Sequence, residues 1–438
     1  SRDVLLATAQ IPSNSTSVYA RRYEVNKPSI NGSTFQPNSE IRFRLNGGGA
    51  TGVVPSTMCL HFDIQTSATN GRCALDQHPA LAVVQRFRSF VSGGKAVDDV
   101  NYCNNFAHAM VQLDGNKNWT KTSGSNLLGS WKYNPQYMNI NQAPDDGNAN
   151  APIEAENAVL SRITTACVNH DGGISVSVPL ALLGCSLANQ NTILPLQALG
   201  MVEFVITLAS VDKAIACLVG DNTTTDMSYE VSNPTLRCSM VEFNADYNRL
   251  FLQLVQGEVG FRMPLNCVNV QQQTTALAAA ASQKDFVFSG AYRAVQDLVM
   301  WKTHPDIDDR LPVGVAGGPN CSAQFSLSTQ RNGNQQSFRV NISGRNYPDY
   351  DAIRTLDEMW WYNQNGLSAL ADCQSAVGCS DMSKFCATAS IGAVAGPFNT
   401  AGVAYPRATP LRGNFLMLLS FKSAREAHNV SIQGADLS

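Results

Sequence analysis

The stretch Phe338-Arg339-Val340-Asn341-Ile342-Ser343-Gly344-Arg345-Asn346-Tyr347-Pro348-Asp349-Tyr350 combines a strand pattern with a turn pattern. Apolar residues alternate with polar ones in its first part: Phe338, Val340 and Ile342. This alternation predicts a half-buried strand, because successive side chains of a strand point to opposite faces. Gly344 and Pro348 then interrupt the pattern and predict a turn.

A helix is expected to follow over Thr355–Leu370. Thr355 and Glu358 have the spacing of a capping box, in which the two side chains bond to free backbone N–H groups at the helix start. Several residues follow the helical spacing of one face: Leu356, Met359, Trp360 and Asn363. We therefore expect Trp360 to pack inward and Trp361 to turn toward another surface.

This strand, turn and helix resemble a segment of the second barrel in double jelly-roll major capsid proteins of the polinton-like virus and virophage lineage of DNA viruses. Tyr229–Leu236, followed by Met240–Glu242, resembles the last strand of the first barrel in that family. Val178–Leu180 and Leu194–Leu196 resemble a two-proline pattern that the family also has.

The resemblance implies an all-β fold with a few short helices, built from two jelly-roll β-sandwich barrels in tandem. It implies a structural protein with no enzymatic activity and no cofactor. Three chains would form a pseudo-hexagonal capsomer, and capsomers would tile an icosahedral shell around double-stranded DNA. Its partners would be further copies of itself, neighbouring capsomers, and minor capsid and penton proteins. It would be made in the host cytoplasm or nucleus and reside in the virion.

Alternating apolar patterns also recur outside these motifs: Ile41/Phe43/Leu45, Leu60/Phe62/Ile64, Ile174/Val176/Val178, Val202/Phe204/Ile206/Leu208 and Phe415/Met417/Leu419. Short strands with turn-rich links are typical of a sandwich or barrel. Two more helices are expected. One carries Tyr102, Phe106, Met110 and Leu113 behind Asp98 and Asp99 as caps, and the other carries Leu250, Phe251 and Leu254 after Asp246.

A chain of 438 residues favours two units, since an all-β barrel commonly takes about 200–250 residues. We expect a first jelly roll over residues 1–245 and a second over 246–438, with the join between Phe243 and Phe261. The longest unpatterned region, residues 114–173, is rich in Asn, Gly, Ser and Pro. We expect this insertion to form an outward loop, because loops of this length are usually functional projections.

Charged residues make up only 15% of the chain, against a usual share of about a quarter. A surface short of charge is less costly to desolvate against a neighbour, which favours a subunit of an assembly. The net charge of −3 and the lack of an Arg/Lys-rich tail argue against neutralisation of a packaged genome by an arm. Sequence-specific nucleic-acid binding is not expected.

The twelve cysteines form no CxxC pair, which argues against a zinc site. Cys185, Cys238 and Cys267 lie in apolar patterns and are expected to be small buried hydrophobes. No apolar run approaches the roughly 18 residues of a membrane-spanning helix, and no signal-peptide pattern is present, so reduced thiols are expected.

Four motifs resemble ligand sites but lack essential parts. His61 and Asp63 share one strand face without a third metal ligand. Asp306, Asp308 and Asp309 lack the glycine and glutamate of a calcium loop. Gly47–Gly49 and Gly93–Lys95 lack the spacing of a phosphate loop. We therefore expect no catalytic, cofactor or metal site here.

Two other interpretations remain open. A jelly-roll lectin or glycoside hydrolase could use Trp360, Trp361 and Tyr362 as a sugar-stacking platform. A single jelly-roll capsid protein of an RNA virus is the other, but the chain is long for it and the basic arm is missing.

Overall fold

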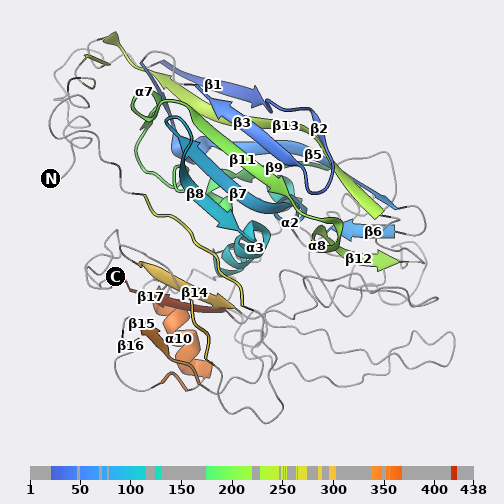
Figure 1. Ribbon diagram of the computed structural model, residues 1–438, viewed down its shortest axis with the longest axis vertical. Helices are drawn as coiled ribbons and strands as arrows, with labels where there is room; N and C mark the ends of the chain where they lie inside the picture. The colour runs from blue at the N-terminus through green and yellow to red at the C-terminus, as the bar shows by residue number, and fades with distance from the viewer. Residues whose placement is uncertain are drawn as a thin grey trace.

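The structure is a computed structural model (Figure 1). The residues that it describes are 21–46, 50–68, 72–75, 78–114, 124–129, 174–219, 227–245, 248–249, 251, 253, 263, 265–273, 285–288, 295–301, 337–342, 344–347, 352–354, 356–366 and 416–421. Most of the first half is therefore described, together with the parts of the second half that carry its strands and its helix.

Strands dominate the described residues. The first half contains β1 (Arg21–Pro28), β2 (Thr34–Phe35), β3 (Glu40–Leu45), β4 (Thr51–Val53), β5 (Cys59–Ala68), β6 (Arg72–Leu75), β7 (Val84–Val91), β8 (Lys95–Asn101), β9 (Ile174–Pro179), β10 (Leu194–Pro195), β11 (Val202–Leu208), β12 (Ile215–Val219) and β13 (Met227–Glu242). The second half contains β14 (Asp297–Trp301), β15 (Val340–Ile342), β16 (Arg345–Tyr347) and β17 (Leu416–Ser420).

The helices are short. They are α2 (Pro79–Ala82), α3 (Cys103–Asp114), α5 (Ser125–Leu128), α7 (Leu196–Leu199), α8 (Val211–Ala214) and α10 (Leu356–Gly366), with the 3-10 turns η1 (Pro55–Thr57) and η4 (Leu180–Leu183). The expected all-β fold with a few short helices is confirmed.

Two antiparallel sheets form the first sandwich (Figure 1). One has the order β10-β4-β13-β5-β9, with β1 and β2 also paired to β13, and the other has the order β3-β11-β7-β8. The chain passes repeatedly from one sheet to the other, so most neighbouring strands are distant in sequence, although β7 and β8 form a hairpin. The apolar faces of both sheets then meet in one continuous core.

The period-two patterns of this half are confirmed. Every predicted inward residue of β3, β5, β9 and β11 is buried: Ile41, Phe43, Leu45, Leu60, Phe62, Ile64, Ile174, Val176, Val178, Val202, Phe204, Ile206 and Leu208. Phe204 of β11 stacks on Phe87 of the adjacent β7, with ring centroids 6.2 Å apart. Alternation predicted these strands well because one face of each lies on the core.

Strand β13 contains the stretch predicted to be the last strand of the first barrel. It pairs with β5 along most of its length, and with β1, β2 and β4 over shorter stretches. The register with β5 shifts between Ser232 and Thr235, where Asn233 has a φ of 52°. Asn233 and Pro234 occupy this break in the ladder. Proline has no N–H to donate to a neighbouring strand, so it is found at irregular positions such as bulges.

The strand and the turn predicted from Phe338 onward are present in the second half. Val340–Ile342 pairs with Arg345–Tyr347 around Gly344, and Phe338 forms a separate bridge with Ile353. Helix α10 begins at Leu356, and the Glu358 carboxylate accepts a hydrogen bond from the backbone N–H of Arg354 at 3.1 Å. The glutamate thus bonds a backbone N–H just before the helix, that of Arg354, while Thr355, its partner in the predicted capping box, lies outside the described residues.

The helix predicted behind Asp98 and Asp99 is present as α3, but these aspartates do not cap it. Both belong to β8. Asp98 is buried, and its carboxylate accepts hydrogen bonds from the Ser89 hydroxyl at 2.6 Å and from the backbone N–H of Ser186 at 3.1 Å. The capping prediction was wrong because an aspartate that meets a buried hydroxyl across the sheet is held in the strand.

The boundary between the halves remains a prediction. Most of the insertion 114–173 lies outside the described residues, although residues 124–129 return to the core, where Leu128 is fully buried. Leu250 and Leu254 of the third expected helix also lie outside them. The segment 265–273, assigned to the second unit, packs several apolar side chains against the first core: Leu265, Val268 and Val270.

A buried tyrosine allows a test of the first sandwich. Tyr229 is 1% exposed, and its hydroxyl donates a hydrogen bond to the carbonyl of Ala209, which is also buried. Tyr229→Phe should lower the free energy of unfolding by about 1–3 kcal/mol, because a buried carbonyl loses its partner. Urea denaturation measures this loss. Tyr23→Phe, on the edge strand β1, serves as the control and should change stability by less than about 0.5 kcal/mol.

Candidate assembly surfaces

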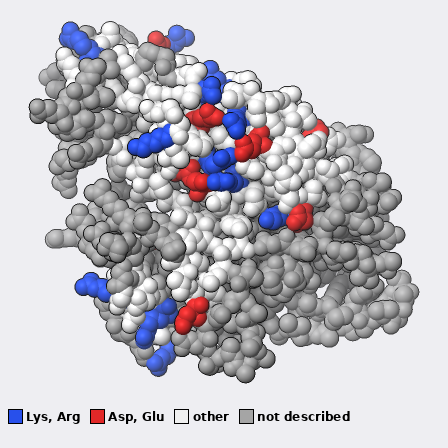
Figure 2. All heavy atoms as spheres, viewed as in Figure 1, with Lys and Arg blue, Asp and Glu red and all other residues white. Residues whose placement is uncertain are grey.

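The outer face of the sheet β3-β11-β7-β8 gathers charged side chains of both signs. Figure 2 shows blue and red atoms interleaved over these strands, whereas the surrounding described surface is mostly white. The residues on this face are Glu40, Arg42, Arg44, Arg86, Arg88, Asp99 and Glu203. For a chain with few charges, this face is unusually rich in them.

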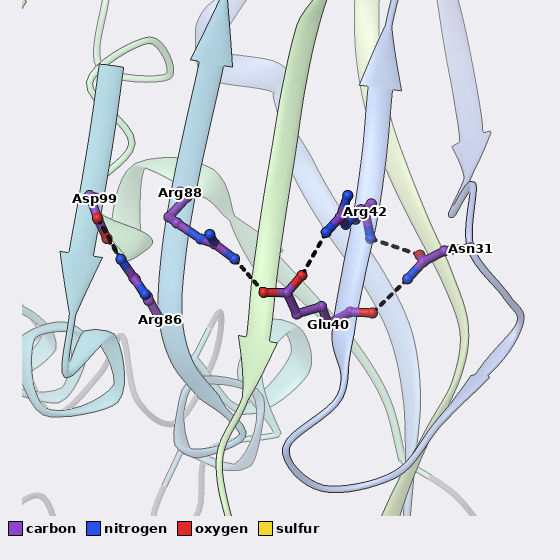
Figure 3. Close-up of polar contacts among 6 residues, drawn as sticks. All are labelled: Asn31, Glu40, Arg42, Arg86, Arg88 and Asp99. Carbon is purple, nitrogen blue, oxygen red and sulfur yellow. Dashed lines mark hydrogen bonds and ion pairs between the residues drawn. The ribbon is translucent and has the colours of Figure 1, made fainter. Parts of the chain in front are cut away.

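Glu40 lies at the centre of this charged face (Figure 3). Its carboxylate accepts a hydrogen bond from Arg42 of the same strand at 2.9 Å and another from Arg88 of β7. Strand β11 lies between β3 and β7, so the pair with Arg88 reaches across a whole strand. Next to it, Arg86 and Asp99 join β7 to β8 through two hydrogen bonds of 2.7 and 2.6 Å.

These ion pairs cover an apolar residue of β11. Val205 lies opposite Arg42 on one side and opposite Arg88 on the other. It is only 3% exposed although Phe204 and Ile206, its neighbours in the strand, point into the core. The long arginine side chains therefore shield a valine on the outer face, as their aliphatic parts can cover apolar surface while the charged ends stay in water.

The charged partners change the acid–base behaviour of this face. The hydrogen bond from Arg42, with the charge of Arg88, lowers the pKa of Glu40 from its ordinary value of 4.5. The hydrogen bond that Arg86 donates to the Asp99 carboxylate raises the pKa of Arg86. Both shifts favour the charged forms, so the pairs persist at neutral pH. Because most of these side chains are well exposed, each pair contributes little energy alone.

A buried apolar contact joins the two halves. Ala109 and Met110 of α3 contact side chains from the second half: Val299, Trp301, Trp360 and Leu416. The opposite face of β14 and β17 packs with α10 and β15 through a separate cluster that includes Met300, Met417 and Leu419. The two-stranded sheet β14-β17 is therefore covered on both faces.

Coverage on both faces explains why β17 is more buried than its sequence pattern predicts. The alternating pattern around Met417 and Leu419 predicted a half-buried strand, and these two residues do share one face. Leu416 and Leu418 are buried as well. A helix from the first half covers the second face, and a pattern local to β17 cannot contain that information.

The two tryptophans of α10 separate as predicted. Trp360 is partly buried against the second-half cluster and against the junction with α3, whereas Trp361 is 47% exposed. Trp361 meets the ring of Tyr362 edge-on, with centroids 5.0 Å apart and an interplanar angle of 85°. These rings do not lie in one plane, so they do not form the flat platform that sugar stacking needs.

The two residues of the candidate metal pair are used by neighbouring strands. His61 Nδ1 lies 2.9 Å from the Ser177 hydroxyl, and burial followed by the nearby charge of Arg237 lowers its pKa. Asp63 accepts hydrogen bonds from the Ser175 hydroxyl and from the Asn233 amide. Both side chains therefore serve the pairing of β5 with β9 and β13.

The remaining candidates have mixed outcomes. Gly93 and Gly94 form the turn between β7 and β8 with φ of 81° and 98°, as expected of a turn. Asp306, Asp308, Asp309 and Gly47–Gly49 lie outside the described residues. Within the described ranges, no group of three or more metal-binding side chains occurs.

Cysteines behave as predicted at two of three positions. Cys185 and Cys238 are fully buried, and burial raises the pKa of Cys238 to about 11. Cys267 is exposed, so that prediction was wrong. Its thiol donates to the carbonyl of Val97 at 3.5 Å in a segment that runs along the surface of the first sandwich.

None of the helices that the structure describes is long and apolar enough to cross a membrane.

No family model and no curated protein sequence matches the chain. Solved structures do match its fold. A quasi-atomic model of the PBCV-1 virus capsid is 12% identical, with a TM-score of 0.52 over 93% of this chain and 78% of that one. The crystal structure of PBCV-1 VP54, fitted into a reconstruction of the virophage Sputnik, has a TM-score of 0.50 with the same identity and coverage. The expected double jelly-roll fold is thereby confirmed.

The neighbouring tryptophans form a matched pair for mutation. Trp360→Ala should lower the free energy of unfolding by roughly 3 kcal/mol, because truncating a core Trp costs about 3–5 kcal/mol and this ring is only partly buried. Trp361→Ala should change it by less than about 1 kcal/mol. Thermal and urea denaturation of both variants would check this, and equal losses would contradict the assignment of Trp360 to the junction.

The Glu40 bridge predicts a pH-dependent contribution to stability. Glu40→Gln should lower the free energy of unfolding by up to about 1 kcal/mol at neutral pH, the usual upper range for exposed ion pairs. Since the pKa of Glu40 is lowered by folding, its contribution is present above 4.5 and disappears as the pH falls through the folded-state pKa. Wild type and variant should then converge in acid.

The measurement is urea denaturation at several pH values. Glu203→Gln, which loses a single pair with Arg44, is the control and should show a smaller effect. A difference between wild type and Glu40→Gln that stays constant down to acid pH would show that the carboxylate charge does not matter.

Proposed function

We propose that this chain is a structural shell subunit, a double jelly-roll major capsid protein that assembles into an icosahedral shell around double-stranded DNA. In this proposal three copies form a pseudo-hexagonal capsomer, and the capsomers tile the shell. The chain would catalyse no reaction and would reside in the virion. Neighbouring capsomers, minor capsid proteins and penton proteins would be its partners.

One observation carries the proposal. The fold agrees over 93% of the chain with a quasi-atomic model of a virus capsid and with a virus protein fitted into a reconstruction of a virophage. Agreement in fold is compatible with more than one function. It nevertheless favours a capsid protein over the alternatives, because both comparisons span the two halves and not a single sandwich.

The surfaces support self-association. The charges on the four-stranded sheet are already paired within the chain, so a neighbour could approach them without leaving isolated charges at the contact. Elsewhere the low charge content reduces the cost of desolvation. Trp361 adds an exposed aromatic side chain, a type that is enriched in protein interfaces.

The carbohydrate-binding alternative has weaker support. Its platform would need Trp360, Trp361 and Tyr362 to offer aromatic faces to one sugar. Trp360 instead packs toward the junction, and Trp361 meets Tyr362 edge-on. We retain this alternative as an outcome of the experiment.

We predict that the purified protein forms a stable trimer, with a mass about three times the chain mass of 47.2 kDa. Obligate interfaces commonly bury more than about 2,000 Å², so the trimer should persist at micromolar concentration and in moderate salt. Light scattering coupled to size-exclusion chromatography gives the mass, and electron microscopy shows whether larger shells form. Trp361→Ala should reduce particle yield more than it reduces stability.

The opposing result is equally clear. A protein that stays monomeric at micromolar concentration and binds oligosaccharides on a glycan array would support the lectin alternative. The same array with Trp361→Ala would then locate the binding site.

A further inference from the structure

The outer edge of β3 is closed by a side chain. Among the described strands, this one ends the sheet order β3-β11-β7-β8, so one row of its backbone N–H and C=O groups faces no neighbouring strand of that sheet. Such an edge can pair with an extended segment of another molecule, which leads to uncontrolled association. The fate of these backbone groups therefore bears on how copies of the chain meet.

Asn31 lies beside the first half of this edge (Figure 3). Its Nδ2 donates a hydrogen bond to the backbone carbonyl of Glu40 at 2.7 Å, and its Oδ1 accepts one from the backbone N–H of Arg42 at 2.9 Å. The backbone N–H of Ile30 adds a bond to the carbonyl of Arg42 at 2.9 Å. Three successive edge groups of β3 are thus occupied by the preceding loop.

The same arrangement occurs in the second half. Asn363 of α10 donates through Nδ2 to the carbonyl of Leu416, and its Oδ1 accepts from the backbone N–H of Leu418 at 2.6 Å. Strand β17 pairs with β14 on its other side. In both halves one asparagine amide therefore bonds the carbonyl of one strand residue and the N–H of the residue two positions later.

This geometry follows from the chemistry of the amide. A neighbouring strand would offer one N–H and one C=O to the same pair of backbone groups. The asparagine side chain carries a donor and an acceptor on one planar group and can replace both, whereas an aspartate can only accept when ionised. Asparagine is thus suited to ending a sheet without a further strand.

We propose that Asn31 and Asn363 are edge locks, side-chain amides that occupy the strand-pairing groups of β3 and β17. They prevent an extended segment of a second copy from adding to these sheets. Contact between copies is thereby left to the side chains of the sandwich walls. The locks act in any assembly of this chain, so their test does not depend on capsid formation.

Asn31 is the better position for the test. It lies in an exposed loop, so its variants should fold, whereas Asn363 is fully buried and its variants would lose stability for several reasons. The loop itself stays attached in a variant, because Ser29 N–H bonds the carbonyl of Pro234 and Asn233 N–H bonds the carbonyl of Ser33.

The experiment compares wild type with Asn31→Ala, Asn31→Asp and the control Gln36→Ala. Gln36 is also exposed and donates to the Glu230 carboxylate at 2.8 Å, so its loss removes a surface amide bond without freeing a strand edge. Hydrogen exchange of the Arg42 amide reports the lock directly. Sedimentation velocity over a concentration series reports association beyond the wild-type species.

In Asn31→Ala the Arg42 amide should exchange roughly tenfold faster, as expected for the loss of one hydrogen bond. Concentration-dependent species absent from wild type and from Gln36→Ala should appear. Asn31→Asp should keep the protection of Arg42, because it still accepts that bond, while leaving the Glu40 carbonyl open. Unchanged exchange at Arg42 would refute the lock, and faster exchange without new association would refute its role between copies. Failure to form a trimer would affect wild type and variants alike and would count only against the capsid proposal.

Discussion

Strand β13 holds the first sandwich together, because it hydrogen-bonds to β1, β2, β4 and β5 along its sixteen residues. Its inward side chains, including Tyr229, Val231 and Leu236, lie in the middle of the core. The irregularity around Asn233 lets one long strand serve different partners on either side of the break. Any change that frees β13 would therefore release four strands together.

The opposite sheet of the sandwich, β3-β11-β7-β8, has its contacts satisfied on the outer face and at the edge as well as in the core. Its Glu40 bridge ties β3 to β7 through side chains that pass over β11, and it covers Val205. At the edge of the same sheet, Asn31 occupies the backbone of β3. The charged side chains of the face and these backbone groups of the edge thus find their partners within one chain. A wall of this kind suits repeated side-by-side contact, since association can proceed without strand exchange.

Helix α3 connects the sandwich to the second half and decides how that half is buried. Its Ala109 contacts Leu416 in a cluster shared with Trp301 and Trp360. Asn363, one turn after Trp360 on the same helix, bonds the backbone of β17. Helix α10 therefore holds β17 through the bonds of Asn363 to the β17 backbone, and it holds the junction through the ring of Trp360. Trp361 is left at the surface.

The sequence by itself determined the class of fold, the strands β3, β5, β9 and β11, and the different environments of Trp360 and Trp361. These are properties of one element with one buried face, and alternation or helical spacing reports them directly. Only the tertiary structure decided the strand assignment of Asp98, the Glu40 bridge and the two asparagine contacts. The alternating pattern Ile41/Phe43/Leu45 predicted β3, but it does not specify a partner of Glu40 across β11. Each of these features joins residues far apart in the chain, and their pairing depends on sheet order and register, which local patterns do not encode.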